Sequence, residues 1–229
     1  MSGALADQLR RAMPPDLLEA IVKISKQLDF EVIDPILSAP TPAESGEMFH
    51  RLLPRFFHYY MSMFELVLAH GLDTARLADL TQASYKTSEA LVSEIGPGWL
   101  GEEAALSAVF GLSTMAHVSK VALTRALPAG DPETANRWVS MIFSYILVST
   151  CLLSAIHELS KGNQTKARPE IGVELAKASE AFALEAYRLS KQLGLLEPVA
   201  IAGEIAPSEE EDIALVNAGL AEWVAGIDR

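Results

Sequence analysis

The chain has 229 residues, half of them hydrophobic, and a formal net charge of −12 from 18 basic and 30 acidic side chains. This charge disfavours a nucleic-acid partner, because phosphate binding needs a basic surface, and the single cysteine, Cys151, excludes an internal disulfide. Residues 1–11 lack the charged start and apolar run of a secretory signal, so we expect a cytoplasmic protein.

The predicted elements are all helices. Apolar residues recur every three or four positions, and no stretch alternates long enough to require a strand. In chain order the expected helices cover 4–12, 15–29, 43–70, 73–95, 102–127, 132–161, 169–193 and 208–226. A short helix interrupted at Pro35 is expected within 30–38. The sequence therefore predicts an all-α fold, an antiparallel up-and-down helical bundle of six to eight helices with a C-terminal helical arm.

Start and stop signals define these boundaries. Thr41-Pro42-Ala43-Glu44 has the form of a capping box with proline in the first helical position, and Asp131 and Ser208 begin similar starts. Pro54 is expected to kink or split its helix. Breaks are expected at Gly71, Gly96-Pro97-Gly98, Pro128-Ala129-Gly130, Gly162-Asn163 and Gly194.

The boundaries divide the chain into a bundle domain, a linker and a final helix. We assign 1–194 to the bundle, 195–207 to the linker and 208–229 to a C-terminal amphipathic helix. An amphipathic helix that follows a linker commonly docks on another surface, so we expect a homo-oligomer and a possible protein partner for this helix. Its apolar face carries Ile213, Val216, Leu220, Trp223 and Ile227.

Small side chains recur at spacings of three and four on three predicted helices. Related stripes lie on 102–127 and 132–161, and the longest, on 169–193, contains Gly172, Ala176, Ser179, Ala183, Ala186 and Ser190. Such stripes let helix backbones approach closely. They favour close antiparallel packing in a soluble bundle, and a membrane-helix interface is the alternative.

Three weakly charged segments raise the question of a membrane. Residues 138–156 carry no charge over a length that could span a bilayer, and 56–72 and 104–119 are also poor in charge. The charged, amphipathic patterns of 73–95 and 169–193 favour a soluble protein whose buried central helix is 132–161. An integral membrane accessory subunit with up to three spans is the alternative.

Candidate catalytic residues lie on two of the predicted helices. One polar face of 43–70 is formed by Arg51, Arg55, His58, Ser62 and Glu65, and its spacing indicates a solvated stripe opposite a core face. If that face lines a cavity instead, His58 and Glu65 are the candidate acid–base pair. His117, on the predicted helix 102–127, likewise belongs either to a solvated face or, if its face lines a cavity, to a catalytic site. No phosphate loop, dinucleotide fingerprint or nucleophile elbow occurs in the sequence.

Candidate metal ligands follow from one assumed hairpin. If 102–127 and 132–161 pair across the turn between them, His157 lies level with Glu102. Glu158 would then complete a cluster at the end of the hairpin, which we interpret as a surface polar group in preference to a metal site. We expect no metal and no cofactor.

The predicted function is a non-enzymatic interaction or ligand-binding role for a bundle that self-associates. The alternative is an enzyme or sensor with an apolar small-molecule pocket between helices. Such a pocket would be lined by aromatic residues such as Phe56, Phe57, Tyr59, Tyr60, Phe64 and Phe110. The same residues would serve equally well in an ordinary core.

Overall fold

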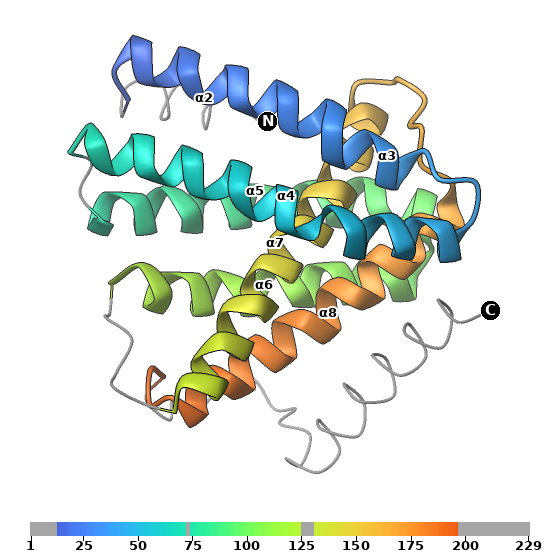
Figure 1. The fold of residues 1–229 in the computed structure, drawn as a ribbon. Helices are drawn as coiled ribbons and strands as arrows, with labels where there is room; N and C mark the ends of the chain where they lie inside the picture. Colours follow the sequence, from blue (N-terminus) through green and yellow to red (C-terminus); the bar gives the residue numbers. More distant parts are fainter. Residues whose placement is uncertain (1–12, 72–73, 125–130, 197–229) are drawn as a thin grey trace.

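A computed structural model describes residues 13–71, 74–124 and 131–196, and the regular elements in these ranges are all helices (Figure 1). They are α2 (Pro15–Leu28), the π-helical turn η1 (Asp29–Ile33), α3 (Asp34–Leu37), α4 (Pro42–Ala69), α5 (Thr74–Leu100), α6 (Glu102–Thr124), α7 (Pro132–Ser160) and α8 (Pro169–Gln192). The predicted all-α helical bundle is confirmed. Four predictions fall outside the described residues: the helix at 4–12, the break at 128–130, most of the linker 195–207, and the C-terminal helix 208–229 with its apolar face.

The predicted helix starts at Thr41 and Asp131 are confirmed by their cap hydrogen bonds. The hydroxyl of Thr41 accepts from the backbone N–H of Glu44 at 3.2 Å. The carboxylate of Asp131 accepts from the backbone N–H groups of Glu133 at 3.4 Å and Thr134 at 2.9 Å. Each cap satisfies backbone donors that have no partner within their own helix, which fixes where α4 and α7 begin.

Proline positions in α3, α4 and α5 differ from what the sequence predicted. α4 runs unbroken through Pro54, and Pro35 lies in the first turn of α3, where proline needs no backbone donor. The break predicted at 96–98 is wrong, because α5 continues to Leu100. Pro97 lies in the last turn of α5, and the chain turns instead at Gly101, whose φ of 85° suits glycine.

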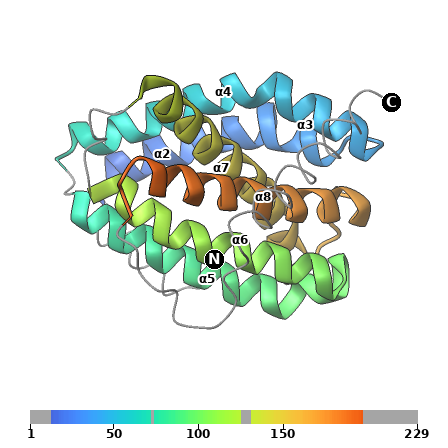
Figure 2. The ribbon, with the colours of Figure 1, turned by 90° about the horizontal axis from the view of Figure 1, so that it is seen from below.

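The helices do not all pack on their neighbours in sequence. α5 and α6 form an antiparallel pair, and α2 packs on α4. α8 then lies between α6 and α7 and contacts both extensively, as two views of the ribbon show (Figures 1 and 2). The α6–α7 hairpin assumed from the sequence is therefore wrong, since these consecutive helices are held together by α8 instead of by each other.

The contacts of α8 are close because its inward residues are small, as predicted. A Cβ added at Gly111 of α6 would lie 2.7 Å from Oγ of Ser179, nearer than side-chain carbons approach one another. The buried small side chains of α8 are Gly172, Ala176, Ala178, Ser179, Ala183, Ala186 and Ser190. α8 runs antiparallel to α7 but parallel to α6, so close packing occurs here in both orientations.

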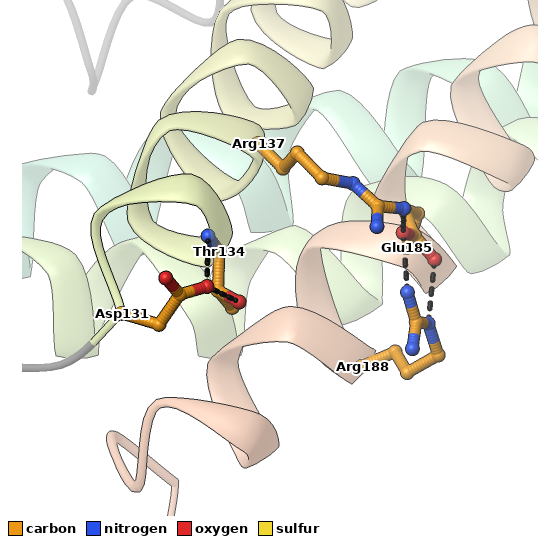
Figure 3. Close-up of polar contacts among 5 residues, drawn as sticks. All are labelled: Asp131, Thr134, Arg137, Glu185 and Arg188. Carbon is orange, nitrogen blue, oxygen red and sulfur yellow. Dashed lines mark hydrogen bonds and ion pairs between the residues drawn. The ribbon is translucent and has the colours of Figure 1, made fainter.

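The α7–α8 interface also contains a buried carboxylate, Glu185, whose side chain is 7% exposed (Figure 3). Arg188 donates to both of its oxygens, from Nε at 2.7 Å and from Nη2 at 2.6 Å, and Arg137 of α7 donates at 2.8 Å. Nearby, Nε1 of Trp138 donates to the hydroxyl of Ser190 at 2.7 Å. These hydrogen bonds fix the position of α7 relative to α8, because a shift of either helix would separate the buried carboxylate from its partners.

Candidate functional site

A pocket of about 500 Å³ opens between α5 and α7, and we call it the α5–α7 groove. Its volume lies within the range usual for small-molecule sites, ~300–1,000 Å³. Its lining is mostly apolar, and among the described residues it contains one ionisable side chain, His157. The lining residues are Met13, Leu77, Leu80, Thr81, Ser84, Thr87, Ser88, Leu91, Thr150, Leu153, Ser154 and His157.

The groove follows from the helical spacing of leucine and hydroxyl residues. On α5 the lining residues recur every three or four positions from Leu77 to Leu91, which is one helix face about 21 Å long. On α7 the same spacing joins Thr150 to His157 over about 10 Å. Between the leucines stand serines and threonines, which are too short to fill the space between two helices and so leave it open.

Four of the hydroxyl groups that line the groove show two situations. Thr87 donates to the carbonyl of Ala83 at 2.9 Å, and Thr150 donates to the carbonyl of Ile146 at 2.6 Å, so the hydroxyl protons of these two threonines are used within their own helices. The hydroxyls of Ser88 and Ser154 make no hydrogen bond to any residue in the described part of the chain. Their hydroxyls can therefore donate to a ligand as well as accept from one.

His157 lies in the last turn of α7 and is half-buried. Burial lowers the pKa of its imidazole, and the nearby Lys161 ammonium lowers it further, so the neutral form of the ring is favoured. The adjacent Glu158 accepts hydrogen bonds from Asn163 at 2.9 Å and Lys161 at 3.3 Å. Glu158 is thereby held in a small network of its own at the end of the helix.

The candidate metal ligands are not assembled into a metal site. Within the described ranges, no group of three histidine, cysteine or acidic residues could hold an ion. Glu102 is exposed in the first turn of α6, and the hairpin that would have set it level with His157 does not form. His157 was selected from the sequence as a neighbour of Glu102, and the structure places it in the lining of the groove instead.

The candidate catalytic residues all face outward, away from the groove. His58 and Glu65 are exposed on α4, and His117 is exposed on α6. Arg55, on the same α4 face, pairs with Glu31 at 2.6 Å. The opposite face of α4 buries Phe56 and Val67, as expected of a solvated stripe opposite a core face. None of the three lines the groove, so the described residues assemble no acid–base pair there.

The pocket with aromatic lining that the sequence suggested as an alternative does not coincide with the α5–α7 groove. Phe56 is buried in the core, whereas Phe57 packs against Phe143 with ring centroids 4.5 Å apart and Phe110 is 47% exposed. No aromatic residue of the described part of the chain lines the α5–α7 groove. A usable signal was present on α5, where Thr81, Ser84 and Ser88 interrupt the helix face that carries the leucines.

Two helices are long and apolar enough to cross a membrane by length and composition alone. They are Glu102–Leu123, with a mean hydropathy of 1.3, and Pro132–Ser160, with 2.1. Half of the apolar window in the second helix is buried within the protein, but only a third of the window in the first helix is. The exposed apolar side chains of the first helix include Leu106, 68% exposed, and Phe110.

Comparisons with protein-family models, with curated proteins and with solved structures find no match to this chain.

Proposed function

We propose that this protein binds a small apolar molecule in the α5–α7 groove and does so without catalysing a reaction. The observation that carries the proposal is the groove itself: about 500 Å³, an apolar lining, and a few polar groups at defined places. That combination is typical of ligand sites between the helices of bundles.

The chemistry of the lining supports binding in preference to catalysis. The described lining residues of the groove include hydroxyls and an imidazole but no carboxylate, so they do not form a triad of serine, histidine and acid. The one thiol, Cys151, is buried in the core, where burial raises its pKa far above that of a reactive cysteine. His58, Glu65 and His117 lie elsewhere on the surface.

The test is a fluorescence titration of the full chain with diphenylhexatriene, an elongated uncharged probe that emits in apolar surroundings. We expect saturable binding that is reduced at least tenfold by Ser88→Trp and by Ser154→Trp, because each indole fills part of the groove. Ser140→Trp, at an exposed position of α7 outside the groove, is the matched control and should leave binding unchanged. Absence of saturable binding, or equal loss in the control, would refute the proposal.

Self-association is a second proposal, favoured by the apolar surface of α6. Leu106 and Phe110 are exposed one turn apart on one face of the helix. Exposed neighbours of this size commonly mark a contact surface. We expect the solution mass from light scattering to exceed that of a monomer and to fall to the monomer value in Leu106→Glu/Phe110→Glu. An unchanged mass in the double variant would exclude this surface.

The C-terminal helix 208–229 is the other proposed contact, and it lies outside the described residues. Its predicted apolar face, from Ile213 to Ile227, motivates a truncation after Ala206. If the truncated chain keeps the mass of the full chain, the helix is not an association element. Comparing this truncation with the α6 variant separates the two surfaces.

A further inference from the structure

The helix α4 has three distinct faces, and one of them is apolar although much of it is exposed. The core face buries Phe56 and Val67, and the polar face carries Arg51 and Arg55. Between these two faces, apolar side chains recur at spacings of three and four residues over about 21 Å. We call this third face the α4 seam, and its residues are Pro54, Phe57, Met61, Phe64 and Leu68.

The α4 seam is positioned as a surface on which a helix can pack. The side chains of Phe57 and Leu68 are 42% and 44% exposed, and those of Met61 and Phe64 are half-buried. The ring of Phe57 packs on Phe143 of α7 with centroids 4.5 Å apart, which fixes its position. Apolar residues repeated in this way over several turns form the contact line of two packed helices. The α4 seam therefore suits one amphipathic helix.

The predicted C-terminal helix has an apolar face of the same spacing and length. From Ile213 to Ile227 its five apolar residues are separated by three, four, three and four positions, as are the five residues of the α4 seam. Each face is about 21 Å long in a helix. In a parallel pair, Ile213 lies level with Pro54 and Ile227 with Leu68, so every apolar residue of one face meets one of the other.

Charge favours the parallel orientation of this pair. Four acidic residues, 209–212, come directly before the apolar face of the C-terminal helix. In α4 the turn before the seam carries Arg51, and Arg55 lies in the next turn. The parallel pair places the acidic residues beside these arginines, whereas the antiparallel pair places them beside Glu65, at the other end of the seam. Opposite charges therefore meet in the parallel pair alone.

The chain beyond α8 is long enough to reach the α4 seam of the same protein. In the last turn of α8, Ser190 accepts a hydrogen bond from Trp138 of α7 at 2.7 Å. Phe143, which contacts Phe57 of the seam, lies about 7.5 Å further along α7. Residues 197–207 can span about 36 Å when extended, which is enough for this path. Attachment to the same chain also gives the helix a high effective concentration at this seam.

We propose that the C-terminal helix 208–229 packs on the α4 seam of its own chain, parallel to α4. This inference goes beyond the proposed binding function, which concerns the α5–α7 groove. It also decides between the two contacts proposed for self-association. The truncation after Ala206 should leave the mass in solution unchanged, and the α6 surface should carry the association.

The test is disulfide formation between two cysteines placed level with each other in the proposed pair. In the full chain, Leu68→Cys/Ile227→Cys should form a disulfide within one chain when oxidised glutathione is added, because the two positions are adjacent across the helices. The native thiol, Cys151, is buried and does not compete. Non-reducing electrophoresis and mass spectrometry distinguish a link within one chain from a link between two chains.

The matched control is Leu68→Cys/Ile213→Cys, which changes the same two residue types. In the parallel pair Ile213 lies about 21 Å from Leu68, so we expect this variant to link at least about tenfold more slowly. A helix that does not pack on α4 would give the opposite order. Ile213 is nearer than Ile227 to the end of α8 along the chain, and a shorter tether brings its thiol to Leu68→Cys more often.

A charge variant tests the orientation independently of the linked positions. Arg51→Glu places an acid beside residues 209–212 and should slow the linking of Leu68→Cys/Ile227→Cys by about threefold at low ionic strength, and by less at high ionic strength. Lys86→Glu, exposed on α5, makes the same change in net charge and should leave the rate unchanged. Equal rates in the two charge variants would exclude the parallel arrangement.

Three results of the linking experiment would overturn the proposal. Equal or faster linking in the Ile213→Cys control would mean that the helix does not pack parallel to α4. A link between two chains would make a second copy the source of the helix. Absence of any link would exclude this helix from the α4 seam. Each of these results leaves the proposed binding of a small molecule in the α5–α7 groove to be judged by its own titration.

Discussion

The α8 interfaces and the α5–α7 groove are both built with small side chains, yet one is closed and the other open. Along α8, Gly111 of α6 meets Ser179 at the same level, and small residues on each helix let the backbones come together. Along α5, serines and threonines face α7, which crosses α5 at a steep angle and diverges from it (Figure 1). Small residues therefore close an interface only where the partner helix stays alongside.

The largest predicted effect comes from removing Glu185, the buried carboxylate of the α7–α8 interface. Glu185→Ala removes the acceptor that Arg137 and Arg188 share, and because both guanidinium groups remain partly exposed to water we expect a loss of about 2–3 kcal/mol in the free energy of unfolding. Urea denaturation followed by circular dichroism measures it. Glu174→Ala is the matched control, since Glu174 pairs with Lys177 at 3.4 Å on the surface of the same helix and should contribute less than about 1 kcal/mol.

A second substitution tests how close the α6–α8 contact is. Gly111→Ala places a Cβ 2.7 Å from Oγ of Ser179 and 3.2 Å from its backbone, so the helices must separate, and we expect a loss of about 1–3 kcal/mol. Gly98→Ala is the control, because its Cβ would meet nothing within 4 Å and alanine favours a helix by about 0.5–1 kcal/mol. Thermal unfolding should shift the two variants in opposite directions. A neutral Gly111→Ala would mean that the interface is looser than the structure shows.

The local features of both regions could be predicted from the sequence, because their causes lie within a few residues. The caps at Thr41 and Asp131 depend on one side chain and the turn that follows it, and the small-residue stripe on α8 is visible as a spacing. The end of α5 was misplaced, since Pro97 in a last turn costs little and Gly101 provides the positive φ. Such differences of a few residues are set by packing that no local pattern contains.

The groove could not be predicted, because it depends on how two distant helices cross. Nothing in the periodicity of α5 states that α7 will diverge from it, and the hairpin assumed between α6 and α7 set the helices in the wrong order. His157 was singled out from the sequence as a weak candidate metal ligand, and the structure places it in the lining of the groove instead. Helices that are consecutive in the sequence usually pack against each other. Here α6 and α7 are consecutive, but α8 lies between them.

A larger side chain in the α5–α7 groove should raise the stability of the protein, whereas one at the α6–α8 interface should lower it. Ser154→Leu adds apolar groups to a groove that has room for them, and at about 0.8 kcal/mol per buried methylene we expect a gain of about 1 kcal/mol in stability. Ser140→Leu, exposed on the same helix, should change stability by less than about 0.5 kcal/mol. Urea denaturation measures both. A loss of stability in Ser154→Leu comparable to that of Gly111→Ala would show that the groove is closed in solution.

The smallest predicted effect concerns two tyrosines, Tyr85, which is partly buried, and Tyr145, which is fully buried. The hydroxyl of Tyr85 lies 3.2 Å from that of Ser119, whereas that of Tyr145 is buried without a hydrogen bond to any described group. Burial raises the pKa of Tyr145 well above its ordinary value, and the hydroxyls of Ser149 and Ser179 offset this only in part, being close but outside hydrogen-bond geometry.

The two tyrosines should therefore respond differently to removal of the hydroxyl. Tyr85→Phe breaks a hydrogen bond and should cost about 1 kcal/mol, while Tyr145→Phe removes a buried polar group that has no such bond and should be neutral or stabilising by up to about 1 kcal/mol. Chemical denaturation at pH 7 measures both, with each ring retained so that packing is unchanged. Equal losses of stability in the two variants would mean that the Tyr145 hydroxyl has a hydrogen-bond partner beyond the described groups. The tightly packed region along α8 would then contain a polar contact.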